Sequence, residues 1–139
     1  MNDKIRKIAI LVIICVGVIV SIYLDRDYEQ YSANIPYVSW AIETENYSQA
    51  LEKLEKIANP DVCMTAATAY CLYKTDAKSS AIRLVTDFLA NKDISESDRD
   101  FLSTFLDAIS KDNISTFILE YKKNNDSSKK NIEYSVRYH

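Results

Sequence analysis

Glycine is nearly absent from this chain. Among 139 residues it occurs once, at Gly17, and proline occurs only at Pro36 and Pro60. Tight hairpins and phosphate-cradling loops depend on glycine, because it adopts backbone angles that other residues avoid. The sequence after Gly17 therefore favours helices joined by short polar turns over hairpins or nucleotide-binding loops.

Histidine is equally scarce, which bears on catalysis. The single histidine is His139, so a Ser–His or Cys–His nucleophile has no base in a suitable place. No His/Cys cluster has the spacing of a zinc site, and no Gly-rich phosphate loop is present. We therefore expect no catalytic residue, no metal site, no cofactor and no small-molecule substrate, and we predict that the protein is not an enzyme. The enzyme alternative would rest on the carboxylates Asp98 and Asp100.

Basic charge is short in most of the chain. Residues 25–121 hold 17 Asp and Glu against 9 Lys and Arg, a net charge of −8. Residues 122–139 hold 5 Lys and Arg against 2 Asp and Glu, a net charge of +3. Nucleic-acid binding needs a basic surface that displaces counterions, so a nucleic-acid partner is not expected. The acidic body is compatible with a basic protein partner, or simply with a solvated surface.

Cysteine is also sparse, with Cys15, Cys63 and Cys71. Cys63 and Cys71 are expected on one helix, where eight residues correspond to about 12 Å along the axis. That separation is too large for a disulfide. We expect these two thiols to be unpaired.

One long apolar run stands near the N-terminus. Residues 8–24 carry no charge over seventeen positions, with Lys4, Arg6 and Lys7 before them. This pattern predicts an uncleaved, single-pass transmembrane helix at 8–24 in the cytoplasmic (inner) membrane. The basic flank predicts residues 1–7 in the cytoplasm and the C-terminal domain in the periplasm or outside. The unpaired cysteines keep the reversed topology open.

The remainder predicts an all-α fold. After a juxtamembrane linker at 25–35, helical periodicity predicts a bundle or array of about six short antiparallel helices in a domain at 36–121. Residues 122–139 form a polar tail, for which disorder is one interpretation. The expected helices are 36–45, a second from Asn46 ended by Asn59-Pro60, 61–73, a fourth capped by Asp76, a fifth opened by Ser95 and a sixth at 113–121.

The second of these helices has aromatic, alanine and apolar residues at a characteristic spacing. Tyr47, Ala50, Leu54 and Ile57 stand where an aromatic, an alanine and two apolar residues pack neighbouring helices, and Asn59-Pro60 follows. This stretch resembles the second helix of a tetratricopeptide (TPR) repeat, and a fainter likeness extends over 36–90. The resemblance implies TPR-like helical hairpins with a concave protein-binding surface and no intrinsic chemistry. An irregular helical bundle is the alternative.

Two groups of aromatic residues are candidates for protein binding. Tyr37, Trp40 and Tyr47 flank the first helix–turn–helix, where they either fill the gap between the helices or stand exposed as interface anchors. In the tail, Tyr134 and Tyr138 belong to a stretch that alternates with period two, typical of a strand. A strand on a helical body has no partner in the chain, so we expect it either to extend a partner's sheet or to remain a mobile terminus.

Together these patterns predict a membrane-anchored, non-catalytic adaptor or scaffold that binds a protein partner. The alternative is a membrane-anchored immunity protein that neutralises a toxin in the cell envelope. Small size, an acidic body and the lack of catalytic groups suit both.

Overall fold

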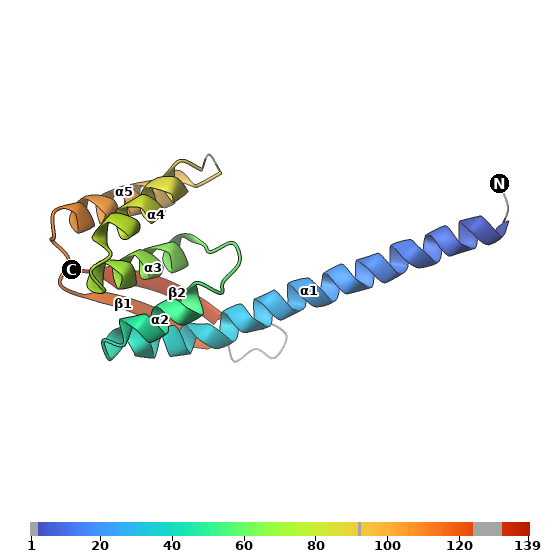
Figure 1. The fold of residues 1–139 in the computed structure, drawn as a ribbon, viewed down its shortest axis with the longest axis horizontal. Helices are drawn as coiled ribbons and strands as arrows, with labels where there is room; N and C mark the ends of the chain where they lie inside the picture. The colour runs from blue at the N-terminus through green and yellow to red at the C-terminus, as the bar shows by residue number, and fades with distance from the viewer. Residues whose placement is uncertain (1–2, 92, 124–131) are drawn as a thin grey trace. The chain divides into compact units, whose positions relative to one another are not determined.

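The computed structural model describes residues 3–91, 93–123 and 132–139, without the side chains of 20–33, 123 and 132. The chain divides into two compact units, 1–32 and 33–139. Helix α1 (Asp3–Glu43) begins in the first unit and ends in the second. Figure 1 shows the order of the elements along the chain.

The structure of the first unit contradicts the predicted transmembrane helix. Within the described residues, no helix has both the length and the apolar character needed to cross a membrane. The predicted transmembrane helix at 8–24, the single-pass topology and the inner-membrane location are therefore wrong. At about 1.5 Å per residue the uncharged run extends roughly 26 Å, less than the ~30 Å of a hydrocarbon core. Lys7 and Asp25 bound it within the same helix.

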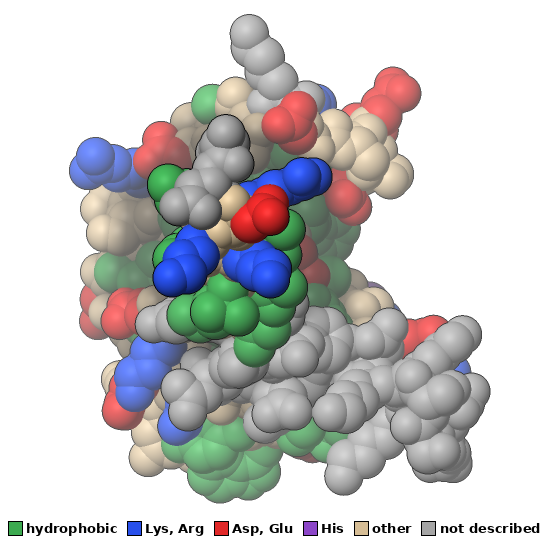
Figure 2. Space-filling view, turned by 90° about the vertical axis from the view of Figure 1, so that its right-hand side faces the viewer, with side chains coloured by type: hydrophobic (Ala, Val, Ile, Leu, Met, Phe, Trp, Pro, Cys, Tyr) green, Lys and Arg blue, Asp and Glu red, His purple; other side chains and the backbone are tan. Residues whose placement is uncertain are grey.

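The described part of this unit exposes apolar side chains around α1. Ile8, Leu11 and Ile13 are 62%, 64% and 70% exposed. Figure 2 looks onto the end at which α1 begins and shows basic side chains beside hydrophobic ones.

The second unit is helical up to residue 110. After the last turns of α1 come α2 (Tyr47–Leu54), α3 (Val62–Lys74), α4 (Lys78–Leu89) and α5 (Glu96–Ser110). Helix α3 is the central element and contacts α2, α4, α5 and both strands. Its alanines Ala66, Ala67 and Ala69 are fully buried, which lets the neighbouring helices approach closely.

Two strands follow, so the all-α prediction is wrong. The expected sixth helix at 113–121 is replaced by strand β1 (Phe117–Lys123), which pairs with β2 (Ile132–Tyr138) as an antiparallel hairpin. Ile114, Phe117 and Tyr121 fit a helical spacing, but Phe117, Leu119 and Tyr121 equally fit the period of a strand. A short apolar run is ambiguous between the two, and pairing with β2 decided the outcome. Of the predicted tail, residues 124–131 lie outside the described residues.

The hairpin register separates an inner and an outer face. Phe117 lies opposite Tyr138 and Leu119 opposite Val136, and both β1 residues are buried. Thr116 and His139 exchange both backbone hydrogen bonds. Because bonded pairs alternate along an antiparallel ladder, the backbone groups of Leu119 and Val136 point to the outer edges of the hairpin.

An aromatic cluster joins the hairpin to the helices. Tyr70 of α3 stacks on Phe117 with ring centroids 4.8 Å apart, and Phe105 of α5 meets Phe117 at 5.9 Å. Phe105 also meets Tyr138 at 5.2 Å. The open end of the hairpin's inner face, where Phe117 and Tyr138 lie opposite each other, is thus packed on α3 and α5.

The helix starts agree in part with the predicted caps. Ser95 accepts a hydrogen bond from the Asp98 N–H and caps α5 as expected, and Asp61 caps α3 through the Met64 N–H. The side chain of Asn46 makes no cap bond to α2. Asp76 does not cap α4, because the N-cap residue there is Ala77.

Residues other than glycine adopt the left-handed conformation just after three of the helices. Glu45, Asp76 and Asp112 have φ values of 62°, 62° and 53° just after α1, α3 and α5. After α1, the Asn46 N–H bonds the Ala41 carbonyl and the Glu45 N–H bonds the Ile42 carbonyl, the pattern of a Schellman motif. Glycine usually occupies this left-handed position because other residues are strained there.

Candidate functional site

Two aromatic side chains stand exposed at the end of α1. Tyr37 is 36% exposed and Trp40 is 48% exposed, and their ring centroids are 5.7 Å apart. The Tyr37 hydroxyl donates to Gln49 Oε1 at 3.2 Å, and Lys53 Nζ lies 5.5 Å from the centre of the Tyr37 ring. These contacts with α2 hold the tyrosine in place while leaving Trp40 open to solvent.

Helical geometry explains why these two rings face outward. The buried residues of this part of α1 are Ile35, Val38, Ala41 and Ile42, which recur at spacings of three and four and form one helix face. Trp40 lies two positions from both Val38 and Ile42, a step that turns a side chain away from that face. The amphipathic pattern that builds the core thus places the tryptophan at the surface.

A cleft lies between the last turns of α1 and β1. It has a volume of about 270 Å³ and is lined by Ser39, Ile42 and Glu43 of α1 and by Phe117, Ile118 and Leu119 of β1. Ser39 Oγ donates to the Leu119 carbonyl oxygen at 2.6 Å and fixes the strand against the helix. The Ile118 side chain is 42% exposed on the rim.

The aromatic pair and the cleft form one surface. Trp40 and Glu43 are three residues apart on α1, and side chains at that spacing are neighbours. Glu43 in turn lines the cleft together with Ile118. We call the exposed residues Tyr37, Trp40, Glu43 and Ile118, with the cleft, the α1–β1 surface.

Glu43 gives this surface a negative charge. It is exposed, and within the described part of the chain no ion pair reaches it. The last turn of α1 carries no basic residue. Because the C-terminal end of a helix is itself partly negative, a carboxylate there is unfavourable rather than stabilising.

The other predicted binding residues lie elsewhere. Tyr47 is half-buried and packs edge-on against Tyr70 at 5.8 Å. Tyr138 is half-buried in the aromatic cluster around Phe105, and the Tyr134 hydroxyl donates to the Asp61 carboxylate. The structure therefore brings Tyr37 and Trp40 together but does not add the other three tyrosines to their surface.

Sequence reasoning missed Glu43 and Ile118. Ile118 falls in the helix expected at 113–121, and as a strand residue it faces outward. Glu43 had a visible signal, an acidic residue in the last turn of a helix.

Both edges of the hairpin face helical elements. On the β1 edge, the Ser39 hydroxyl donates a hydrogen bond to the Leu119 carbonyl. On the β2 edge, the Val136 N–H forms a hydrogen bond with the Cys63 side chain. The strand at 132–138 pairs within the chain, so the expectation that it lacks an internal partner is wrong. Unpaired strand edges invite association, and these contacts limit it.

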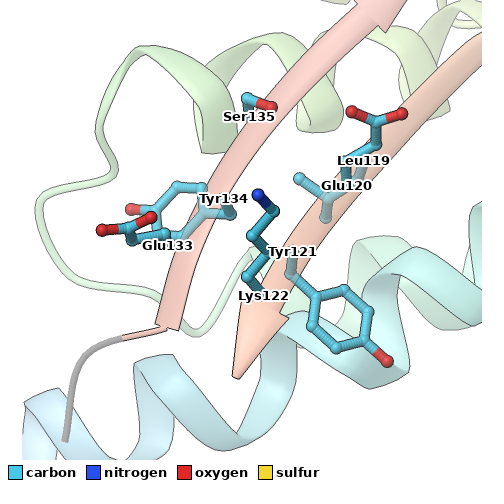
Figure 3. A pocket seen from close by; sticks show the side chains of 7 residues that line it. All are labelled: Leu119, Glu120, Tyr121, Lys122, Glu133, Tyr134 and Ser135. Carbon is cyan, nitrogen blue, oxygen red and sulfur yellow. The ribbon is translucent and has the colours of Figure 1, made fainter. Parts of the chain in front are cut away.

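The far end of the hairpin carries a wider, open hollow. Its volume is about 540 Å³, and its lining includes Lys122 of β1 with Glu133 and Ser135 of β2 (Figure 3). On the same outer face Arg137 pairs with Glu120 at 2.6 Å. Within the described ranges, no group of three His, Cys, Asp or Glu side chains could hold a metal ion. The mixed charges of this hollow select no particular ligand.

Cys63 and Cys71 are free, as predicted; Cys71 is buried and Cys63 is partly buried. Burial, with smaller effects from Asp61 and Asp98, raises the pKa of Cys63 to about 11 against the opposing Val136 N–H bond. Burial raises the pKa of Cys71 to about 12. Both thiols are protonated at neutral pH, whereas the nucleophilic form is the thiolate.

Comparison of the chain with protein-family models, with curated proteins and with solved structures finds no match. The TPR resemblance accordingly stays a prediction.

Proposed function

We propose that this protein is a non-catalytic binding module that docks a protein partner on the α1–β1 surface. The observation that carries the proposal is the exposure of Trp40, 48%, beside Tyr37 and an apolar cleft. Tryptophan and tyrosine dominate the binding energy of protein interfaces because they bury a large area with little loss of side-chain freedom.

The surroundings of Trp40 support this role. Tyr37 is held by Gln49 and Lys53, so less conformational entropy is lost when a partner covers it. The cleft beside the rings offers a recess for a partner's side chain, and anchors seated in pockets contribute most of the affinity at interfaces. The protonated state of Cys63 and Cys71 agrees with a role in binding rather than in nucleophilic chemistry.

Site-specific photo-crosslinking in cells tests the proposal. A photoreactive amino acid at Ile118 should crosslink a protein partner, whereas the same group at Arg83 on α4, 86% exposed at its side chain, should not. Trp40→Ala should remove the Ile118 crosslink, because loss of a hot-spot tryptophan weakens binding by about 30-fold or more. Equal crosslinking from both positions, or insensitivity to Trp40→Ala, would contradict the proposal.

The identity of the partner then separates two kinds of module. Recovery of assembly or transport subunits would indicate an adaptor. Recovery of one secreted toxin would indicate an immunity protein.

A further inference from the structure

The α1–β1 cleft has the size and lining of a site for a single side chain. Its volume of about 270 Å³ falls below the ~300–1,000 Å³ typical of small-molecule sites. Ile42, Phe117 and Leu119 are each at most 5% exposed and form its apolar lining. The Leu119 carbonyl already accepts the Ser39 hydroxyl, so that polar group is satisfied without a ligand. An apolar side chain is the chemistry that such a recess accepts.

The rim of the cleft adds a charge requirement. Glu43 places a carboxylate at the negative end of α1, an arrangement that costs the free protein stability. An unfavourable local charge that no contact compensates is typical of a functional position. A cation beside Glu43 would relieve this repulsion and form a charge-assisted hydrogen bond.

We propose that the partner segment bound at this surface is a basic, apolar peptide. It places an aliphatic or aromatic side chain in the α1–β1 cleft and a neighbouring lysine or arginine against Glu43. Residues 25–139 hold 19 Asp and Glu against 14 Lys and Arg, and this net charge of −5 favours the approach of such a segment. This inference rests on the proposed function and names the chemistry of the ligand.

Selection from a random peptide display library on the full-length chain is the first part of the test. Enriched peptides should carry Lys or Arg next to Leu, Ile or Phe. Because Trp40 is the single tryptophan, its fluorescence reports binding of the synthetic peptides directly at the surface. Affinity should fall as salt is raised, since an exposed ion pair is screened.

Matched variants form the second part. Glu43→Gln should weaken the enriched peptides by about tenfold, the scale of one charge-assisted contact at a partly desolvated rim. Glu55→Gln removes the same charge from an exposed position outside the cleft and should change affinity by less than about twofold. Urea unfolding of both variants checks that neither loses its fold.

The outcomes distinguish this inference from the proposed function. Enriched peptides without basic residues, or equal effects of Glu43→Gln and Glu55→Gln on affinity, would overturn the inference. In that case a loss of binding with Trp40→Ala would still uphold the proposed function. Binding that does not depend on Trp40 would overturn both. Concentration-dependent dimerisation abolished by Ile118→Asp would assign the surface to a second copy of the chain and also overturn the inference.

Discussion

Replacing Glu45 by glycine should stabilise the protein. Glu45 has φ 62° in the turn after α1, and its side chain is exposed. The left-handed conformation costs a residue with a Cβ about 1–2 kcal/mol, and glycine avoids that cost. Glycine also loses more backbone entropy on folding, roughly 0.5–1 kcal/mol. The difference is a net stabilisation of about 0.5–1 kcal/mol.

Chemical denaturation followed by circular dichroism measures this difference. For a domain of roughly 100 residues, about 0.5–1 kcal/mol corresponds to a rise of roughly 2–8 °C in Tm. Glu52→Gly is the matched control, because Glu52 is an exposed residue inside α2. It should destabilise by about 0.5–1 kcal/mol, the helix-propensity cost of glycine.

The opposite signs of the two changes are the decisive result. A loss of stability with Glu45→Gly, or a shift of both variants in the same direction, would refute the assignment of strain to the turn after α1. Asp112→Gly should gain less, because it also removes the 3.0 Å ion pair of Asp112 with Lys78. Asp76→Gly should gain less as well, since aspartate tolerates the left-handed region better than glutamate.

Other predictions concern the hairpin and the thiols. Phe105→Ala should cost about 3–5 kcal/mol in urea unfolding, because this fully buried ring packs against three aromatic neighbours; a cost below about 1 kcal/mol would contradict that packing. Ser39→Ala should cost about 1–3 kcal/mol by leaving the Leu119 carbonyl without its partner, and the check is that Ser39→Thr retains most of the stability. Cys63 and Cys71 should react slowly with a disulfide reagent at pH 8 in the folded protein and rapidly in urea, and fast labelling of the native state would show that they are not shielded. Their raised pKa values also mean that the folded state holds these protons more tightly, so stability should be complete below pH 9 and fall as pH rises from about 9 to 12.

The helices from α2 to α5 could be predicted because their signals are local. Apolar residues at helical spacing mark α4 and α5, and the Ser95 and Asp61 caps act within one turn of the residues they serve. The exposed position of Trp40 also follows from the spacing of its buried neighbours on α1. Such features need no knowledge of the distant chain.

Strand β1 could not be predicted because its signal is not local. Phe117 and Tyr121 satisfy both a helical and a strand spacing, and the choice depends on β2, with Phe117 paired to Tyr138 twenty-one positions later. The membrane prediction failed for a related reason. An apolar run was interpreted by its composition, whereas the described part of α1 lacks the continuous apolar length that crossing requires.

The sequence by itself determined the helical body, the free thiols and the lack of glycine that leaves Glu45, Asp76 and Asp112 in left-handed turns. These properties follow from residue type and short-range spacing. Only the tertiary structure decided that β1 pairs with β2, and that this pairing sets Ile118 beside Glu43 on one cleft. A surface assembled from α1 and a strand about seventy-five residues away depends on packing and backbone pairing, which no local pattern encodes.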